Sequence, residues 1–181
     1  METTYLIDTN ILVYAYNEDV EFHEEALKIL ENALNNKINA AIADKSLFEF
    51  FAIITDKKRV ENPITVDETI EIIDFLVDSN IKIIYSSPFS FLKTLELTKK
   101  YQVKRQDIFD INLISLMIQN KIDTIITADD KHFKNIKEIK VFNPFMTKEY
   151  LETRGKRRNK KKFMDALSKV PDAEPEEYDK L

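Results

Sequence analysis

The sequence contains no cysteine, which excludes disulfides, thiolate zinc sites, iron–sulfur clusters and cysteine nucleophiles together. It holds a single glycine, Gly155, so it lacks the glycine-rich loops that let a backbone approach phosphate closely in ATPases and dehydrogenases. The two histidines, His23 and His132, are too few for most histidine-based metal sites. Any chemistry must therefore come mainly from carboxylates.

Long hydrophobic runs are also lacking. No apolar run reaches the roughly 18 residues that a membrane helix needs, and the N-terminus does not show the pattern of a secretory signal. We therefore expect a soluble cytoplasmic protein that makes no membrane contact, which the lack of cysteine also favours. At 181 residues, the chain is long enough for one domain with a hydrophobic core and an appended segment.

Short β-branched or apolar segments alternate with longer helical patterns along the chain. Thr65 with Glu68, and Ser46 with Glu49, each predict a capping box at the start of a helix. The alternation is typical of a parallel sheet wrapped by helices. We expect an α/β fold of three layers (α/β/α), with four or more helices and a parallel sheet of about five strands. The predicted strands are residues 4–7, 40–43, 81–85, 124–127 and 140–142.

Charge is distributed unevenly along the chain. Residues 1–146 hold 17 basic against 24 acidic side chains, residues 147–162 hold 8 against 2, and residues 163–181 hold 2 against 6. We therefore expect one domain over residues 1–146, followed by a charged C-terminal extension over residues 147–181. The extension would consist of a basic arm at 154–162 and a short amphipathic helix with an acidic end at 163–181.

An aspartate follows the first predicted strand. Asp8 comes directly after that strand, and Asn10 lies two residues on, at a predicted helix start. In an open parallel sheet, ligands bind at the carboxyl ends of the strands, near the point where strand order reverses. Asp and Asn at a helix start also commonly serve only as caps. The sequence leaves both roles open for Asp8.

Two further acidic segments lie on predicted helices. Glu49 sits among phenylalanines, and it is either the capping partner of Ser46 or a partly buried charge that needs a partner or a metal. Asp107 and Asp110 stand three apart in the first turn of a helix, where acidic residues are also favoured by the helix dipole alone. Asp107 is the better cap, whereas Asp110 precedes an apolar run and is the better site candidate.

The fourth acidic segment follows the strand predicted at 124–127. Thr127 and Asp130 are predicted to form a cap pair, which would leave Asp129 pointing toward the same edge of the sheet as Asp8. If such acids converge within about 5 Å, each like-charge pair repels by roughly 3 kcal/mol at an effective dielectric near 20. A divalent cation or protonation must relieve that cost. Oxygen ligands alone select Mg²⁺ or Mn²⁺, and this chemistry suits phosphodiester cleavage.

The order and spacing of these segments resemble PIN-domain ribonucleases, including the VapC toxins of toxin–antitoxin pairs. The likeness covers residues 4–145 and is carried by "LIDTNILVY", "FHEEALKIL", "SLFEFFAII", "IFDINLISLM" and "IDTIITADDKHF". The resemblance implies a five-stranded parallel sheet between helices and a Mg²⁺- or Mn²⁺-dependent ribonuclease. It also implies an RNA substrate, an antitoxin protein as a candidate partner and a homodimeric assembly.

The resemblance assigns roles to individual residues. The implied metal-binding and catalytic residues are Asp8, Glu49, Asp110 and Asp129, with Asn10 and Thr127 as supporting polar groups. Asp8 and Asp110 are expected to bind the metal directly, and Glu49 and Asp129 mainly through water. Both histidines are expected to be structural. Ala128 stands where the family frequently has a polar residue.

Other interpretations remain open at this stage. A PIN-like fold without catalysis, acting as an RNA-binding or scaffold module, is the alternative function; phosphatase and receiver-domain interpretations fit the acidic pattern less well. The C-terminal extension is a solvated terminus, an RNA-holding arm or an autoinhibitory segment. The residues of the arm that would bind RNA are Lys156, Arg157, Arg158, Lys160, Lys161 and Lys162.

Overall fold

A computed structural model of the chain describes residues 3–133 and 135–146. Within that part, the strands are β1 (Thr4–Ile7), β2 (Asn39–Ala43), β3 (Lys82–Ile84), β4 (Thr124–Ile126) and β5 (Lys140–Phe142). The helices are α1 (Thr9–Tyr16), α2 (His23–Leu34), α3 (Asp44–Ile54), α4 (Val66–Asp78), α5 (Pro88–Tyr101) and α6 (Ile108–Gln119), with a 3₁₀ turn η1 (Arg105–Asp107) before α6. The predicted alternation of strands and helices is confirmed.

The strands form one parallel sheet in the order β3-β2-β1-β4-β5. The chain lays β2 and β3 on one side of β1 and then crosses to the other side for β4 and β5. Leu6 in β1 is in register with Ala41 of β2 and with Ile125 of β4. Because strand order reverses beside β1, the carboxyl ends of β1 and β4 meet at the switch point where parallel sheets bind ligands.

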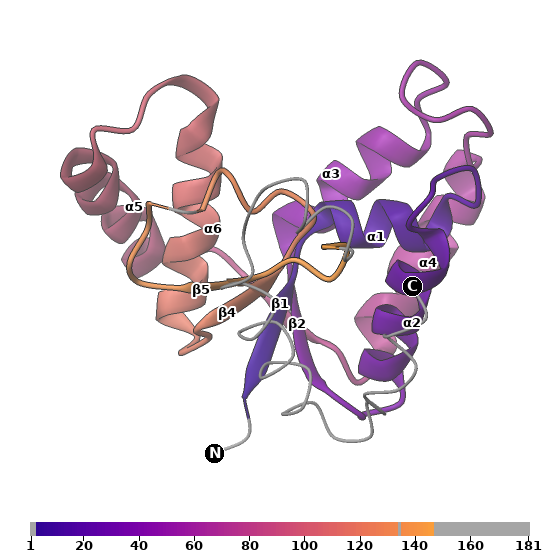
Figure 1. Cartoon of the computed structure of the whole chain (residues 1–181), viewed down its shortest axis with the longest axis horizontal. Coiled ribbons are helices and arrows are strands. Elements are labelled where there is room, and N and C mark those ends of the chain that lie inside the picture. Colours follow the sequence, from indigo (N-terminus) through magenta and orange to yellow (C-terminus); the bar gives the residue numbers. More distant parts are fainter. Residues whose placement is uncertain (1–2, 134, 147–181) are drawn as a thin grey trace.

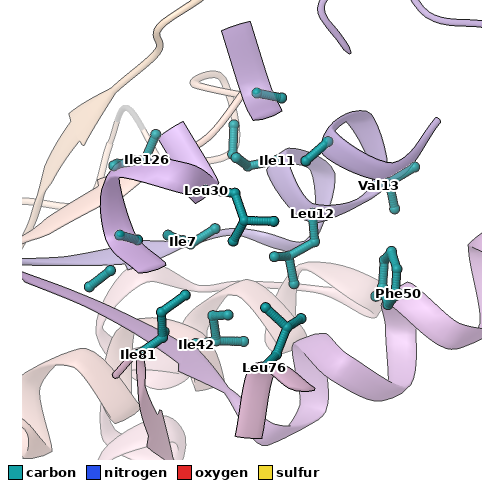
Figure 2. Close-up of a cluster of buried hydrophobic side chains, with 14 of the residues drawn as sticks. Ile7, Ile11, Leu12, Val13, Leu30, Ile42, Phe50, Leu76, Ile81 and Ile126 are labelled. Carbon is teal, nitrogen blue, oxygen red and sulfur yellow. The ribbon is translucent and has the colours of Figure 1, made fainter. Parts of the chain in front are cut away.

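Helices cover both faces of the sheet, as the three-layer prediction requires. Figure 1 shows α1, α2, α3 and α4 on one side of the sheet and α5 and α6 on the other. Successive residues of a strand point to opposite faces, so Leu6 and Ile7 are both fully buried but belong to different apolar clusters. In the apolar cluster shown in Figure 2, Ile7 lies among side chains that come from helices, including Leu12, Phe50 and Leu76.

One predicted capping box is present and the other is wrong. The Thr65 side chain accepts a hydrogen bond from the backbone N–H of Glu68, and the Glu68 carboxylate accepts one from the backbone N–H of Thr65. Helix α3, however, begins at Asp44 with Ala43 as its N-cap, and Ser46 is buried inside the helix. Because β2 runs into α3 without a loop, the end of the strand sets the start of the helix.

The predicted cap pair of Thr127 and Asp130 is also wrong. The described residues between β4 and β5 form turns and bends rather than a helix, so there is no helix start there for Thr127 to cap. The hydroxyl of Thr127 accepts instead from the backbone N–H of Asp129 at 3.0 Å. This short turn directly follows β4 and brings the Asp129 backbone back toward the strand end.

The C-terminal extension predicted over residues 147–181, with its six basic RNA-binding candidates, lies outside the described residues. The domain boundary at residue 146 stays a prediction for the same reason. Among the helices that the structure describes, none has both the length and the apolar character needed to cross a membrane.

Candidate functional site

Asp8 lies directly after β1 and is the N-cap residue of α1. Its Oδ1 accepts a hydrogen bond from the backbone N–H of Thr9 at 2.8 Å, which is the capping role considered from the sequence. Its Oδ2 accepts from the Asn10 Nδ2 at 2.9 Å and from the Thr127 hydroxyl at 2.6 Å. The carboxylate is therefore held from both sides of the junction between β1 and β4.

Thr127 is the central polar group of this junction and is fully buried. While its hydroxyl donates to Asp8, it accepts from the Asn10 Nδ2 at 2.9 Å and from the backbone N–H of Asp129 at 3.0 Å. The Asn10 Oδ1 in turn accepts from the backbone N–H of Ala128 at 3.0 Å. The two predicted supporting residues thus tie the α1 start to the loop after β4, and at Ala128 the backbone rather than a side chain makes the contact.

Glu49 reaches the same region from α3. Its Oε2 accepts a hydrogen bond from the Thr9 hydroxyl at 2.9 Å. The sequence suggested partial burial among phenylalanines, but Glu49 is exposed. On the helix, Leu47 and Phe50 turn into the core, whereas Phe48 points to solvent with 74% of its surface exposed. The apolar residues beside Glu49 in the sequence therefore do not bury its carboxylate.

His132 bridges two of the predicted site residues. Its Nδ1 lies 3.0 Å from Oδ2 of Asp110, and its Nε2 lies 3.4 Å from Oδ2 of Asp129. Potential ligand atoms of Asp107, Asp110 and His132 all lie within 4.8 Å of one another. The sequence predicted a purely structural role for His132, and no local pattern pointed to its contacts with Asp110 and Asp129.

Electrostatics connect carboxylates that come from distant segments. Burial raises the pKa of Asp8; the hydrogen bonds from Thr127 and Thr9 lower that pKa, and the charges of Glu49 and Asp110 raise it. Asp8 therefore lies within electrostatic range of a carboxylate from α3 and another from α6.

The pKa of His132 is raised mainly by its hydrogen bond to Asp110, with further raising from the charges of Asp129, Asp110 and Asp107 against a lowering by burial. The imidazole therefore favours its charged form beside these carboxylates. A cation at this position is electrostatically favoured, whether it is an imidazolium or a metal ion.

Lys45 is a site residue that sequence reasoning missed. It is the second residue of α3, and its Nζ donates a hydrogen bond to the backbone carbonyl of Phe109 at 2.5 Å, which joins α3 to the first turn of α6. Burial lowers the pKa of Lys45 to about 8, against the raising effect of charges that include Asp110, Glu49 and Asp8. Lys45 lies one helical turn before Glu49, and this spacing indicated that the two side chains share one side of α3.

These contacts link the predicted site residues around the carboxyl ends of β1 and β4. Asp8, Asn10 and Thr127 share hydrogen bonds, and Thr9 connects Asp8 to Glu49. His132 connects the remaining two carboxylates, those on α6 and on the loop after β4. A half-buried carboxylate with a raised pKa, together with its carboxylate neighbours, is a donor set that suits a hard divalent cation such as Mg²⁺ or Mn²⁺.

Comparison with known proteins gives a family match and several structural likenesses. The model of the PIN domain family matches residues 5–139. No curated protein sequence matches the chain well enough to count as a relative.

The similar solved structures share the fold at low sequence identity. A structure of VapBC2 from Rickettsia felis bound to a DNA fragment from its promoter gives 24% identity and a TM-score of 0.56, with 78% of this chain and 98% of that chain covered. VapC20 of Mycobacterium tuberculosis, a toxin that cleaves the sarcin–ricin loop, gives 9% identity and a TM-score of 0.57, with 73% and 95% covered. VapBC-1 from nontypeable Haemophilus influenzae gives 16% identity and a TM-score of 0.54, with 78% and 98% covered.

Proposed function

The chain belongs to the PIN domain family, and from that membership we propose that it is a metal-dependent ribonuclease that hydrolyses RNA phosphodiester bonds in the cytoplasm. The observation that carries the proposal is the gathering of carboxylates at the carboxyl end of β1, where Thr9 donates to both Asp8 and Glu49 and where the charges of Glu49 and Asp110 raise the pKa of Asp8. Carboxylates held this close raise the free energy of the folded state unless a cation joins them. Groups perturbed in this way gather at functional sites.

The residues proposed to hold the metal are the four predicted from the sequence: Asp8, Glu49, Asp110 and Asp129. Asp8 and Asp110 would bind it directly, and Glu49 and Asp129 mainly through water. When bound, Mg²⁺ or Mn²⁺ supplies Lewis-acid chemistry, lowering the pKa of water and neutralising charge on the phosphate. The donors are carboxylate oxygens, which these two ions prefer over softer ligands.

The other polar residues of the site orient these carboxylates. Thr127 and Asn10 both donate to Oδ2 of Asp8, which fixes the direction in which that carboxylate faces. Thr9 holds Oε2 of Glu49. Carboxylates fixed in this way would accept a proton from the attacking water without first reorganising, which is how a preorganised site accelerates a reaction.

Cleavage of a mixed pool of structured and single-stranded RNA tests this function. The wild-type chain should cleave with Mg²⁺ or Mn²⁺ and not with chelator, and Asp8→Asn should lose cleavage while its circular dichroism spectrum stays unchanged. Asp78→Asn, at the exposed C-terminal end of α4, is the matched control and should cleave normally. A wild-type chain that binds RNA but cleaves none of it under any metal would instead support the non-catalytic RNA-binding module.

A partner protein is part of the proposal. Similar structures include a toxin–antitoxin complex from Klebsiella pneumoniae, with 21% identity and a TM-score of 0.53, and we propose that this chain is likewise the toxin of a pair. Helix α4 exposes Val66, Ile70 and Val77, which fall on one side of the helix and offer an apolar surface for an antitoxin segment. Expression of the chain alone should arrest growth of a bacterial host, and Asp8→Asn should abolish the arrest.

A homodimer is proposed through α5. Phe91, Leu92 and Leu95 on this helix are 60%, 65% and 47% exposed, and their spacing places them on one stripe. A second copy that applies the same stripe would bury it symmetrically. Sedimentation of the purified chain should show a dimer, and Leu92→Glu should give a monomer while Phe75→Glu on α4 does not. A monomeric wild-type chain would refute this part of the proposal.

A further inference from the structure

Helix α4 carries the largest net charge of the described helices. Five of its 13 residues are acidic and none is basic. Four of the carboxylates are exposed and follow the helical spacing i, i+4, i+7 and i+11, so they form one acidic stripe along the helix: Asp67, Glu71, Asp74 and Asp78. None of the four makes an ion pair with another residue that the structure describes. Their negative charge is therefore open to a cationic partner.

An apolar stripe lies directly beside the acidic stripe. It consists of Val66, Ile70 and Val77, which are 53%, 45% and 44% exposed. Each of these residues directly precedes a member of the acidic stripe in the sequence, so the two stripes run side by side along α4. A surface of this kind fits a segment that combines basic residues with an apolar face.

The chain's own C-terminal extension has this composition. Residues 154–162 include seven basic side chains and no acidic one. The next residues include an apolar set, Phe163, Ala166, Leu167 and Val170, whose spacing predicts one stripe on a helix. In residues 154–170, positive charge and an apolar stripe therefore follow one another, which complements both stripes of α4.

The described chain ends on the side of the sheet that carries α4. The Phe145 ring stacks on the ring of Phe22, just before α2, with the centroids 4.6 Å apart. At the other end of α2, the backbone carbonyl of Leu34 accepts a hydrogen bond at 3.5 Å from the side-chain amide of Asn80, which lies just after α4. Both helices lie on the same side of the sheet in Figure 1.

The length of the chain after residue 146 allows contact with α4. Helix α2 has 12 residues and is therefore about 18 Å long, which sets the scale of the separation between Phe145 and the end of α4. The eight residues from 147 to 154 can span up to about 26–29 Å when extended. The basic run therefore starts within reach of the acidic stripe.

We propose that residues 154–170 dock on α4 of the same chain, with their basic side chains against the acidic stripe and the apolar residues from Phe163 onward against the apolar stripe. This docking does not depend on the proposed ribonuclease function. Its consequence does: the apolar stripe is the surface proposed for an antitoxin segment, so the extension would cover that surface until a partner displaces it.

Paramagnetic NMR on the full chain tests the docking. Because the sequence has no cysteine, Ser168→Cys takes a nitroxide label at one position only. The amide signals of α4 should lose most of their intensity while the nitroxide is oxidised and regain it on reduction. The amides of α5, on the other side of the sheet in Figure 1, should keep their intensity throughout. Salt at about 1 M, where the screening length is about 3 Å, should weaken the effect on α4.

Variants of the two stripes test each half of the contact. The double variant Glu71→Lys with Asp74→Lys, and separately Ile70→Gln, should each restore the α4 signals in the labelled chain. Glu96→Lys, an exposed acid on α5, is the matched control and should leave the loss of signal unchanged. All these positions are exposed, and the amide spectrum with the label reduced checks that each variant is folded.

Three results would overturn the proposal. The first is an equal loss of signal on α4 and α5, or no loss on either helix. The second is a loss centred on Asp8 and Asp110, which would place the extension over the candidate metal site. The third is a loss that appears on isotope-labelled chains mixed with nitroxide-labelled ones, which would assign the contact to a second copy. None of these measurements uses RNA or metal, so failure of the docking leaves the ribonuclease function to its own cleavage test.

Discussion

Replacing Thr127 with valine removes one hydroxyl and keeps the shape of the side chain. Thr127 is fully buried, and its hydroxyl serves three partners: the carboxylate of Asp8, the side-chain amide of Asn10 and the backbone N–H of Asp129. The substitution therefore tests whether this one group holds the turn at β1 and the loop after β4 together.

The cost of the substitution follows from these contacts. A hydrogen bond to a charged group contributes about 1.5–3 kcal/mol. Asn10 keeps a second acceptor in Asp8, and the Asp129 N–H belongs to an exposed residue, so its loss of a partner adds little. We expect a loss of about 1.5–3 kcal/mol in the free energy of unfolding. In a chain of this size that corresponds to a fall in Tm of roughly 4–9 °C.

Thermal unfolding followed by circular dichroism measures this effect in metal-free buffer. Thr124→Val is the matched control because Thr124 is also a buried threonine, but its hydroxyl donates only to the exposed Asp123, at 2.7 Å. The control should lose about 3 °C or less. If Thr127→Val melts within the error of the control, the hydroxyl does not hold the site together and the reasoning fails.

Four further outcomes follow from the structure. Phe50→Ala should lower the free energy of unfolding, measured by urea denaturation, by about 3–5 kcal/mol because the side chain is fully buried. Phe75→Ala, at an exposed position, should change the same free energy by no more than about 0.5 kcal/mol. NMR titration should give His132 a pKa above its ordinary 6.5, and Asp110→Asn or added Mg²⁺ should lower that pKa, because the substitution removes the negative charge beside the imidazolium and a bound Mg²⁺ offsets it. Because that pKa is raised on folding, the stability it contributes is present below pH 6.5 and is lost as the pH rises through the higher, folded-state value. Thr65→Ala removes the capping box of α4 and should cost about 1 kcal/mol in the same urea titration; an unchanged midpoint would contradict the capping role. Mg²⁺ at 100 times its dissociation constant for the wild-type chain should raise the free energy of unfolding of that chain by about 2.7 kcal/mol. The same Mg²⁺ concentration should raise the free energy of unfolding of Asp110→Asn by less, and an equal rise in both would exclude Asp110 as a ligand.

The strands could be predicted because each contains a short run of apolar or β-branched residues. The predictions at 4–7 and 140–142 match β1 and β5, and the other three strands differ by one or two residues at their ends. Parallel strands covered on both faces carry a continuous apolar signal that needs no knowledge of the tertiary structure. The order of the strands, by contrast, was not predicted, because no local pattern of residues determines which strands pair.

The errors occurred where tertiary structure overrides a local motif. Ser46 with Glu49 reads as a capping box, but the direct passage from β2 into α3 places Ser46 inside the helix. Lys45 was not predicted as a site residue, and His132 was given only a structural role, because their partners, Phe109 and Asp110, lie far away in the sequence. The sequence contains each of these side chains, but only the packing of α3 and the loop after β4 against α6 brings them together.

The most direct test of the proposed metal site is the anomalous diffraction of Mn²⁺ in a crystal of the wild-type chain. Two sets of candidate ligands share Asp110: the predicted carboxylates that include Asp8, and the group that Asp110 forms with Asp107 and His132. We expect one peak or two within roughly 2.0–2.5 Å of carboxylate oxygens of both Asp8 and Asp110, distances typical of hard cations bound by oxygen. No peak at saturating Mn²⁺, or a peak bound by Asp107 and His132 but remote from Asp8, would contradict it.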